Sequence, residues 1–437
     1  MPTLRPPRSR RLLTCAFVAL TAAAHADAPG GEPIAAVRDY LTACRADRGQ
    51  LWGQTLCGRV ILVDPATRRA LATEPPPAPG FEAVGALWQG VLPAELVIAN
   101  TSFTWSGRRW VMAQLPLPAD RFVRLSLLLH ESFHRIQPDL GLAERDAVNP
   151  HLDERDGRYW LRLELRALAG ALRHGGPGRA QAVRDAALFR RMRYARYPGA
   201  EATEDALERQ EGLPEYTGIR LALTALHLPV ARAADDLAAF EARPTFVRSL
   251  GYGTGPALGL LLDDAAPGWR RRVRKDGFAA QLARAIRFSP PADLAPAAAL
   301  AAARYGGPEL ARAEDERAVD RARRLAELRA RLVDGPIVRF RQSDLSTRFN
   351  PNQLVPLGDE GTVYPTGRFA AAWGTLDVTD GGALVAPDMT QLRVPAPAPP
   401  VATGRTVGGP GWTLELAAGW RLVAGSRAGD LELARDP

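Results

Sequence analysis

A five-residue motif inside an apolar helix constrains this chain more than any other feature. The motif is His130-Glu131-Ser132-Phe133-His134, an HExxH sequence. The predicted helix around it has one apolar stripe, formed by Phe122, Leu125, Leu129, Phe133 and Ile136. Residues four apart share a helix face, so both histidines can reach one zinc ion, and Glu131 can take a proton from water. The alternative is two core histidines bonded to carbonyls, but a buried imidazole is costly without a partner or a metal.

A catalytic zinc ion takes three protein ligands and keeps one position open, so a third ligand has to be found. The segment after His134 is Arg135-Ile136-Gln137-Pro138, which does not continue an HExxHxxGxxH pattern. The usual alternative is a glutamate from a second helix, and the chain offers two. Glu211 lies in a predicted helix at 203–226. Glu164 lies beside a leucine stripe in another predicted helix, where a buried salt bridge to an arginine is its other interpretation.

The run Glu211-Gly212-Leu213-Pro214-Glu215-Tyr216 resembles the glutamate helix of the gluzincin metallopeptidases, especially of their aminopeptidase-N-like branch. The resemblance implies that Glu211 is the third ligand. We expect Gly212, which has no side chain, to let this helix lie close to the HExxH helix, and Glu215 to lie behind the ligands or on the surface. A second stretch, Tyr252-Gly253-Thr254-Gly255, resembles the Tyr-x-Lys-Gly motif of these enzymes except at the lysine. It implies that the Tyr252 hydroxyl stabilises the oxyanion of the tetrahedral intermediate. The other interpretation is a glycine-rich turn with Tyr252 in the core.

The chain departs from this family in two respects. His134 and Glu211 are 77 positions apart, which is longer than the usual connection, and an inserted helical hairpin at about 158–194 would account for the difference. The Gly-Ala-Met-Glu-Asn motif, which helps to bind a free amino terminus in those aminopeptidases, is absent. The resemblance therefore implies a metallopeptidase, but not aminopeptidase specificity.

The N-terminus has the three parts of a secretory signal peptide at residues 1–26. Arginines are followed by a short apolar run and by the small-x-small site Ala24-His25-Ala26. We expect an exported chain, periplasmic or extracellular; the alternative is an uncleaved anchor. Cleavage would remove four arginines and no acidic residue, so the formal charge of +8 becomes +4. Since Lys275 is the only lysine, we read the remaining basicity as compositional and predict no nucleic-acid partner.

The mature chain keeps two cysteines, Cys44 and Cys57. In an oxidising compartment they can form one disulfide across a short loop, and buried thiols are the alternative. Outside residues 1–26 the sequence has no apolar run of the roughly 18 residues that a membrane span needs. We therefore expect no stable membrane span after signal removal.

The order of the patterns predicts an α+β, zincin-like fold. Residues 27–95 read as an irregular lead-in with one strand, and 96–115 read as a β-hairpin turning at Ser106-Gly107. Asp120 is a candidate N-cap that opens about 200 residues of helical pattern. We place a mostly helical catalytic domain at 27–335 and a β-rich region at 336–437, where short apolar stretches alternate with turn residues.

These observations predict an exported zinc-dependent metallohydrolase that cleaves peptide or protein substrates. His130, His134 and Glu211 would bind Zn²⁺, and Glu131 and Tyr252 would act on the substrate. The hairpin would offer an edge strand along which an extended peptide lies. The alternative is a non-enzymatic secreted or envelope binding protein that retains a zincin scaffold. The sequence does not determine the oligomeric state.

Overall fold

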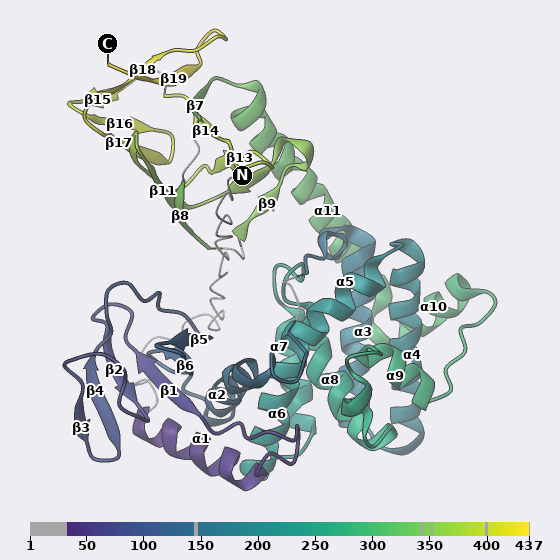
Figure 1. The fold of residues 1–437 in the computed structure, drawn as a ribbon. Coiled ribbons are helices and arrows are strands. Elements are labelled where there is room, and N and C mark those ends of the chain that lie inside the picture. Colours follow the sequence, from purple (N-terminus) through teal and green to yellow (C-terminus); the bar gives the residue numbers. More distant parts are fainter. Residues whose placement is uncertain (1–32, 144–146, 342–344, 351–352, 398–400, 437) are drawn as a thin grey trace, which may run out of the picture. The chain divides into compact units, whose positions relative to one another are not determined.

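The computed structural model of this protein describes most of the chain after the predicted signal peptide, and residues 1–26 lie outside the described part. The described residues are 33–143, 147–341, 345–350, 353–397 and 401–436. They form two compact units, residues 1–314 and 315–437, so that the division falls within one long helix (Figure 1). Among the described residues, no helix is both long and apolar enough to cross a membrane.

The first unit begins with helix α1 (Pro33–Asp47) and a six-stranded sheet. The strands are β1 Arg59–Val63, β2 Arg69–Ala72, β3 Glu82–Val84, β4 Leu87–Val91, β5 Thr101–Trp105 and β6 Arg108–Gln114. Their order is β3-β4-β2-β1-β6-β5, and only the β1–β6 pair is parallel. The expectation of an irregular lead-in was therefore wrong. The strands β2 to β4 have only three to five residues and mixed burial, which leaves little alternation to recognise.

The predicted β-hairpin is confirmed as β5 and β6, although its strands begin at Thr101 and not at 96. Ser106 and Gly107 connect them, and both have positive φ angles, 46° and 74°. Such a two-residue turn matches the right-handed twist of the strands it joins. β5 is the last strand of the sheet order, so one of its edges has no strand partner among the described residues.

Helix α2 (Arg121–Ile136) carries the HExxH motif and packs on β5, β6 and α1 (Figure 1). Its start is fixed by Asp120, whose side chain accepts hydrogen bonds from the backbone N–H groups of Phe122 and Val123 at 2.8 and 3.0 Å. Gln137 still has helical backbone angles and bonds the oxygen of Phe133, but Pro138 has no N–H to continue the helical hydrogen bonds, so the helix ends there. Both ends agree with the sequence-based expectation.

The remaining helices of this unit lie on the other side of α2 from the sheet (Figure 1). They are α3 Arg155–Arg173, α4 Gly176–Arg196, α5 Ala200–Leu207, α6 Leu213–Ala225, α7 Ala231–Glu241, α8 Leu250–Ala265, α9 Phe278–Ala285 and α10 Leu294–Ala302. Of these, α6 is the one that packs closely on α2. A π-helical turn, Glu208–Gly212, joins α5 to α6, and short 3₁₀ turns occupy Pro150–Asp153, Trp269–Arg272 and Ala303–Tyr305. The expected hairpin at 158–194 is the pair α3–α4. The short helices α7, α9 and α10 were not predicted.

Cys44 in α1 and Cys57 before β1 form a disulfide, with their Cα atoms 5.2 Å apart. This confirms the predicted pair and ties α1 to the sheet.

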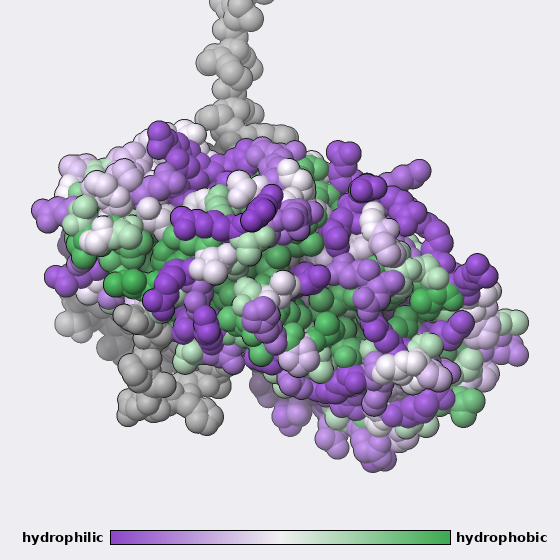
Figure 2. All heavy atoms as spheres, turned by 90° about the horizontal axis from the view of Figure 1, so that it is seen from below, coloured by the Kyte–Doolittle hydropathy of each residue, from purple (hydrophilic) through white to green (hydrophobic). Residues whose placement is uncertain are grey.

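On the face shown in Figure 2, a band of hydrophobic side chains runs between hydrophilic ones.

The second unit is all β after its helix, which confirms the expected C-terminal β region. Helix α11 (Gly307–Arg329) crosses from the first unit and continues as a π-helical turn, Ala330–Asp334. The strands are β7 Ile337–Arg341, β8 Ser346–Phe349, β9 Val355–Pro356, β10 Thr362–Tyr364, β11 Gly367–Ala371, β12 Gly374–Val378, β13 Ala383–Val385, β14 Gln391–Pro395, β15 Val401–Thr403, β16 Thr406–Gly409, β17 Trp412–Leu416, β18 Trp420–Ala424 and β19 Leu431–Arg435. They form a seven-stranded sheet, β18-β19-β7-β14-β13-β10-β9, and a six-stranded sheet, β15-β16-β17-β12-β11-β8. Phe340, Phe369 and Trp373 lie in their shared core.

Candidate metal centre

Three potential metal-binding atoms from two helical segments surround one central position. The Nε2 atoms of His130 and His134 are 3.1 Å apart. An Oε2 atom of Glu211 lies 3.7 Å from the first and 3.5 Å from the second. A triangle with these sides has its centre about 2.0 Å from every corner, which is the length of zinc–nitrogen and zinc–carboxylate bonds. The three side chains that the sequence predicted as ligands are therefore brought together with metal-binding spacing.

The outer nitrogen of each histidine is already bonded, which fixes the role of the inner one. Nδ1 of His130 lies 2.6 Å from Oε2 of Glu215, and Nδ1 of His134 lies 2.8 Å from Oε1 of Gln137. An ionised carboxylate only accepts hydrogen bonds, so Nδ1 of His130 donates. In neutral rings each Nε2 carries a lone pair, and two such acceptors at 3.1 Å repel one another unless a metal ion or a proton lies between them.

Gln137 connects the two halves of the site, and sequence reasoning did not identify it. Its Nε2 donates to the backbone oxygens of Leu142, Arg209 and Gln210 at 3.1, 3.0 and 3.2 Å. These bonds orient the amide, so its Oε1 must accept from His134. One side chain therefore holds a histidine and also bonds the π-helical turn that carries Glu211. Its position three residues after His134, on the same helix face, is the signal that could have indicated it.

Glu211 lies in the π-helical turn between α5 and α6, and α8 supports it. The Tyr252 hydroxyl donates to Oε2 of Glu211 at 2.6 Å. The Tyr252 ring stacks on the His130 ring, with centroids 5.6 Å apart and planes 7° from parallel. Tyr252 therefore contacts two of the three predicted ligands. It belongs to the first turn of α8 and not to a separate glycine-rich turn.

Glycines let these segments approach closely, but not in the way the sequence suggested. We expected Gly212 to bring its helix near α2. A Cβ atom at Gly212 would instead meet Gly255 of α8, 3.1 Å from its Cα atom. The close approach to α2 is made by Gly218, where a Cβ atom would collide with the backbone of Ser126. Gly212 therefore allows contact with the helix that carries Tyr252, and Gly218 allows contact with the HExxH helix.

The site is anionic and buried. The ligand atoms of His130, Glu131 and His134 lie within 4.8 Å of one another. Burial raises the pKa of Glu131, and burial with the charge of Glu211 raises that of Tyr252. Burial alone would lower the pKa of His134, but the charge of Glu211 outweighs it and raises the pKa to about 9. Carboxylates gathered around two imidazoles favour a positive charge at the centre.

The other residues considered from the sequence have different surroundings. Both carboxylate oxygens of Glu164, the alternative third ligand, are paired with Arg190 and Arg193 at 2.6 and 2.7 Å. This is the buried salt bridge that was its other interpretation. The hydroxyl of Tyr216, part of the matched motif, donates to Asp263 and contacts no ligand among the described residues.

Comparison with known proteins gives this chain no relative. No protein-family model, no curated protein and no solved structure matches it. The function has to be argued from the geometry of the site.

Proposed function

We propose that this chain is an exported zinc-dependent metallohydrolase, a peptidase built on a zincin-like arrangement of sheet and helices. One observation carries the proposal: two Nε2 atoms and one carboxylate oxygen converge at zinc spacing, while both Nδ1 atoms are held by other side chains. The predicted signal peptide at 1–26 is the basis for export.

The donor set fits zinc better than other common cations. Two imidazoles and one carboxylate form the His₂Glu set of catalytic zinc sites, whereas magnesium and calcium prefer oxygen ligands. The carboxylate of Glu215 and the amide of Gln137 orient the rings in the manner expected of residues behind metal-bound histidines. When bound, zinc would polarise a substrate carbonyl and lower the pKa of water.

The protein groups around this centre have distinct roles in the proposed reaction. A carboxylate oxygen of Glu131 lies within 4.8 Å of a ring nitrogen of each histidine, so it can accept the proton of the attacking water and pass it to the leaving amine. Burial raises the pKa of Glu131, so its carboxylate holds a proton more readily than an exposed glutamate does. This suits a group that takes up a proton and returns it. The Tyr252 hydroxyl donates its single proton to Oε2 of Glu211, and by turning from that carboxylate it could donate to the developing oxyanion instead.

The sheet supplies a place for an extended substrate. β5 is an edge strand, and it packs on α2, which carries His130 and His134. A peptide that adds to this edge would bond its backbone to β5 and lie close to the motif helix. This geometry favours a peptide or protein substrate.

The decisive experiment combines metal analysis with one isosteric substitution. The purified protein should contain about one zinc per chain and should hydrolyse casein. Glu131→Gln should keep the zinc, because the ligands remain, and lose at least about 100-fold in activity, because the base is gone. Full activity in Glu131→Gln would contradict the mechanism. A wild-type protein without zinc or hydrolysis would favour the scaffold alternative.

A further inference from the structure

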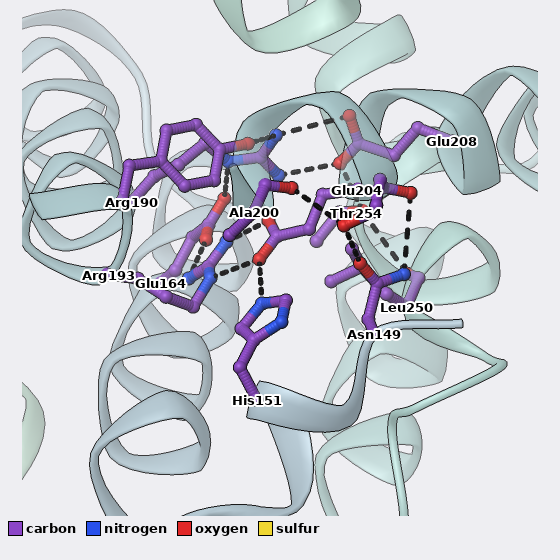
Figure 3. A network of polar contacts seen from close by, with 12 residues as sticks. Asn149, His151, Glu164, Arg190, Arg193, Ala200, Glu204, Glu208, Leu250 and Thr254 are labelled. Atoms are coloured by element: carbon purple, nitrogen blue, oxygen red, sulfur yellow. Dashed lines mark hydrogen bonds and ion pairs between the residues drawn. The ribbon is translucent and has the colours of Figure 1, made fainter. Parts of the chain in front are cut away.

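A buried network of charged side chains lies behind the π-helical turn (Figure 3). It links four segments that carry carboxylate or guanidinium groups: α3, α4, α5 and the turn itself. Its charged members are Glu164, Arg190, Arg193, Glu204 and Glu208, and every one is at most 4% exposed. Arg190 and Arg193 of α4 both pair with Glu164 of α3, and each then reaches a different glutamate.

One arm of the network ends on the first residue of the turn that carries Glu211. Arg190 donates to both oxygens of Glu208, at 2.6 and 3.1 Å. The Thr254 hydroxyl donates to the same carboxylate at 2.6 Å. Thr254 lies two residues after Tyr252 in α8, so two hydroxyls of one helix hold the two glutamates of one turn, Thr254 on Glu208 and Tyr252 on Glu211.

The other arm leads away from the turn. Arg193 donates to both oxygens of Glu204 in α5, at 2.7 and 2.6 Å. His151 bonds the same carboxylate at 2.7 Å. Both arginines are thus buried and both pair with Glu164, but within the described part of the chain only Arg190 bonds the turn of the predicted ligand.

Stability alone is a weak reason for such a network. Burying ions has a desolvation cost that often equals or exceeds their attraction, and well-packed apolar residues can be as stable. Fixing a geometry is a better reason. A π-helical turn is rare and departs from regular helix bonding, and such turns are frequent at functional sites. Charged hydrogen bonds of fixed direction can hold it where apolar packing would let it relax.

We propose that Arg190, Glu208 and Thr254 are positioning residues that hold the π-helical turn so that Glu211 meets His130 and His134. The inference rests on the proposed zinc site. It also gives the α3–α4 hairpin, which lengthens the connection between His134 and Glu211, a function: it carries Glu164 and Arg190 to the back of the turn.

The test measures Zn²⁺ affinity by competition with a chromophoric chelator, together with the visible absorption of the Co²⁺-substituted protein. Thr254→Val removes the hydroxyl with little change of volume and should weaken Zn²⁺ binding about tenfold and alter the Co²⁺ bands. Thr254→Ser keeps the hydroxyl and should restore both. Arg190→Lys cannot hold both oxygens of Glu208 and should behave like Thr254→Val.

Arg193→Lys is the matched control, because it weakens the arm that does not reach the turn. It should lower the melting temperature and leave Zn²⁺ affinity within about threefold of the wild type. If Arg190→Lys does not fold, the Thr254→Val and Thr254→Ser pair decides. Folded Thr254→Val with wild-type Zn²⁺ affinity and Co²⁺ spectrum would overturn the positioning role and leave the proposed function intact. A wild-type protein that binds no Zn²⁺ would overturn both.

Discussion

Glu211 and Glu164 are both fully buried glutamates on helical segments, and the partners of their carboxylates separate them. Glu211 meets two imidazoles and a tyrosine hydroxyl. Glu164 meets two guanidinium groups. A carboxylate already neutralised by two arginines is a poor metal ligand, whereas one that faces two imidazoles favours a positive charge beside it, as a metal ion or as a proton on His134.

Substitution by alanine should therefore affect mainly zinc binding at Glu211 and mainly the stability of the fold at Glu164. Glu211→Ala should release zinc on dialysis and abolish hydrolysis, because a ligand is lost. Glu164→Ala should keep zinc when folded but lower the free energy of unfolding by about 3 kcal/mol, because it leaves two buried arginines short of a partner. Zinc content and urea unfolding measure these effects. Loss of metal only in Glu164→Ala would refute the assignment of Glu211.

Gln137 allows a second test at the level of one residue. Gln137→Met keeps the volume but removes the bond to His134 and those to Arg209 and Gln210, so zinc affinity should fall roughly 10- to 100-fold. Gln281→Met is the control, since Gln281 is equally buried and donates to a backbone oxygen outside the site. It should cost stability only. Equal zinc affinity in the two variants would show that Gln137 does not hold the ligands.

At the level of elements, the contact between α8 and the π-helical turn is made by backbone against backbone. A Cβ atom at Gly255 would lie 2.7 Å from the oxygen and 2.8 Å from the carbonyl carbon of Gly212, and neither can move independently of the turn. α8 carries both hydroxyls that bind the turn. The spacing of these two elements therefore sets the position of Glu211 directly.

Gly255→Ala should separate the two elements. We expect a loss of about 1–3 kcal/mol of stability from overpacking, together with weaker zinc binding. Gly170→Ala is the matched control in α3, because its nearest neighbours would be 3.9 Å away and alanine favours a helix by up to about 1 kcal/mol. Thermal unfolding should thus move in opposite directions in the two variants. A Gly255→Ala protein as stable as Gly170→Ala would contradict the close contact.

The elements that could be predicted from the sequence are those whose signals are local. The apolar stripe and the Asp120 cap define α2, and the Ser106-Gly107 turn defines the β5–β6 hairpin. The apolar run of β1 was also predicted as a strand, whereas β2 to β4 are short segments of mixed burial that depend on pairing partners up to 22 positions away, so they were not recognised. The helices α7, α9 and α10 are too short for a periodic pattern to stand out.

The site follows the same division between local and long-range signals. The spacing of His130, Glu131 and His134 is a property of one helix and could be read directly. The spacing of Gln137 from His134 indicates its contact with that histidine. The contacts of Gln137 and Arg190 with the turn at 208–212 join segments 72 and 18 positions apart, and no local pattern encodes them. The expectation for Gly212 named a real close approach but the wrong neighbour, because a sequence does not say which helix a glycine faces.

At the scale of the whole molecule, the first unit buries several ionised groups and should respond to acid through them. Burial alone would raise the pKa of Glu204, but the charge and hydrogen bonds of Arg193 outweigh it and lower the pKa from 4.5 to about 2. The folded state therefore binds this proton less readily than the unfolded state. The stability that Glu204 contributes is present above about pH 4.5 and is lost as the pH falls toward 2.

The expected size of this effect follows from the shift, since each pKa unit corresponds to about 1.4 kcal/mol and the total is about 3 kcal/mol. Glu204→Gln cannot ionise, so it should be less stable than the wild type at pH 7, and the difference should shrink as the pH is lowered to 3. Hydrogen exchange of the α4 amides in urea measures this unit separately from the β-rich one. A wild-type advantage that stays constant from pH 7 to pH 3 would contradict the role of Glu204, because an uncharged contact has no reason to depend on pH.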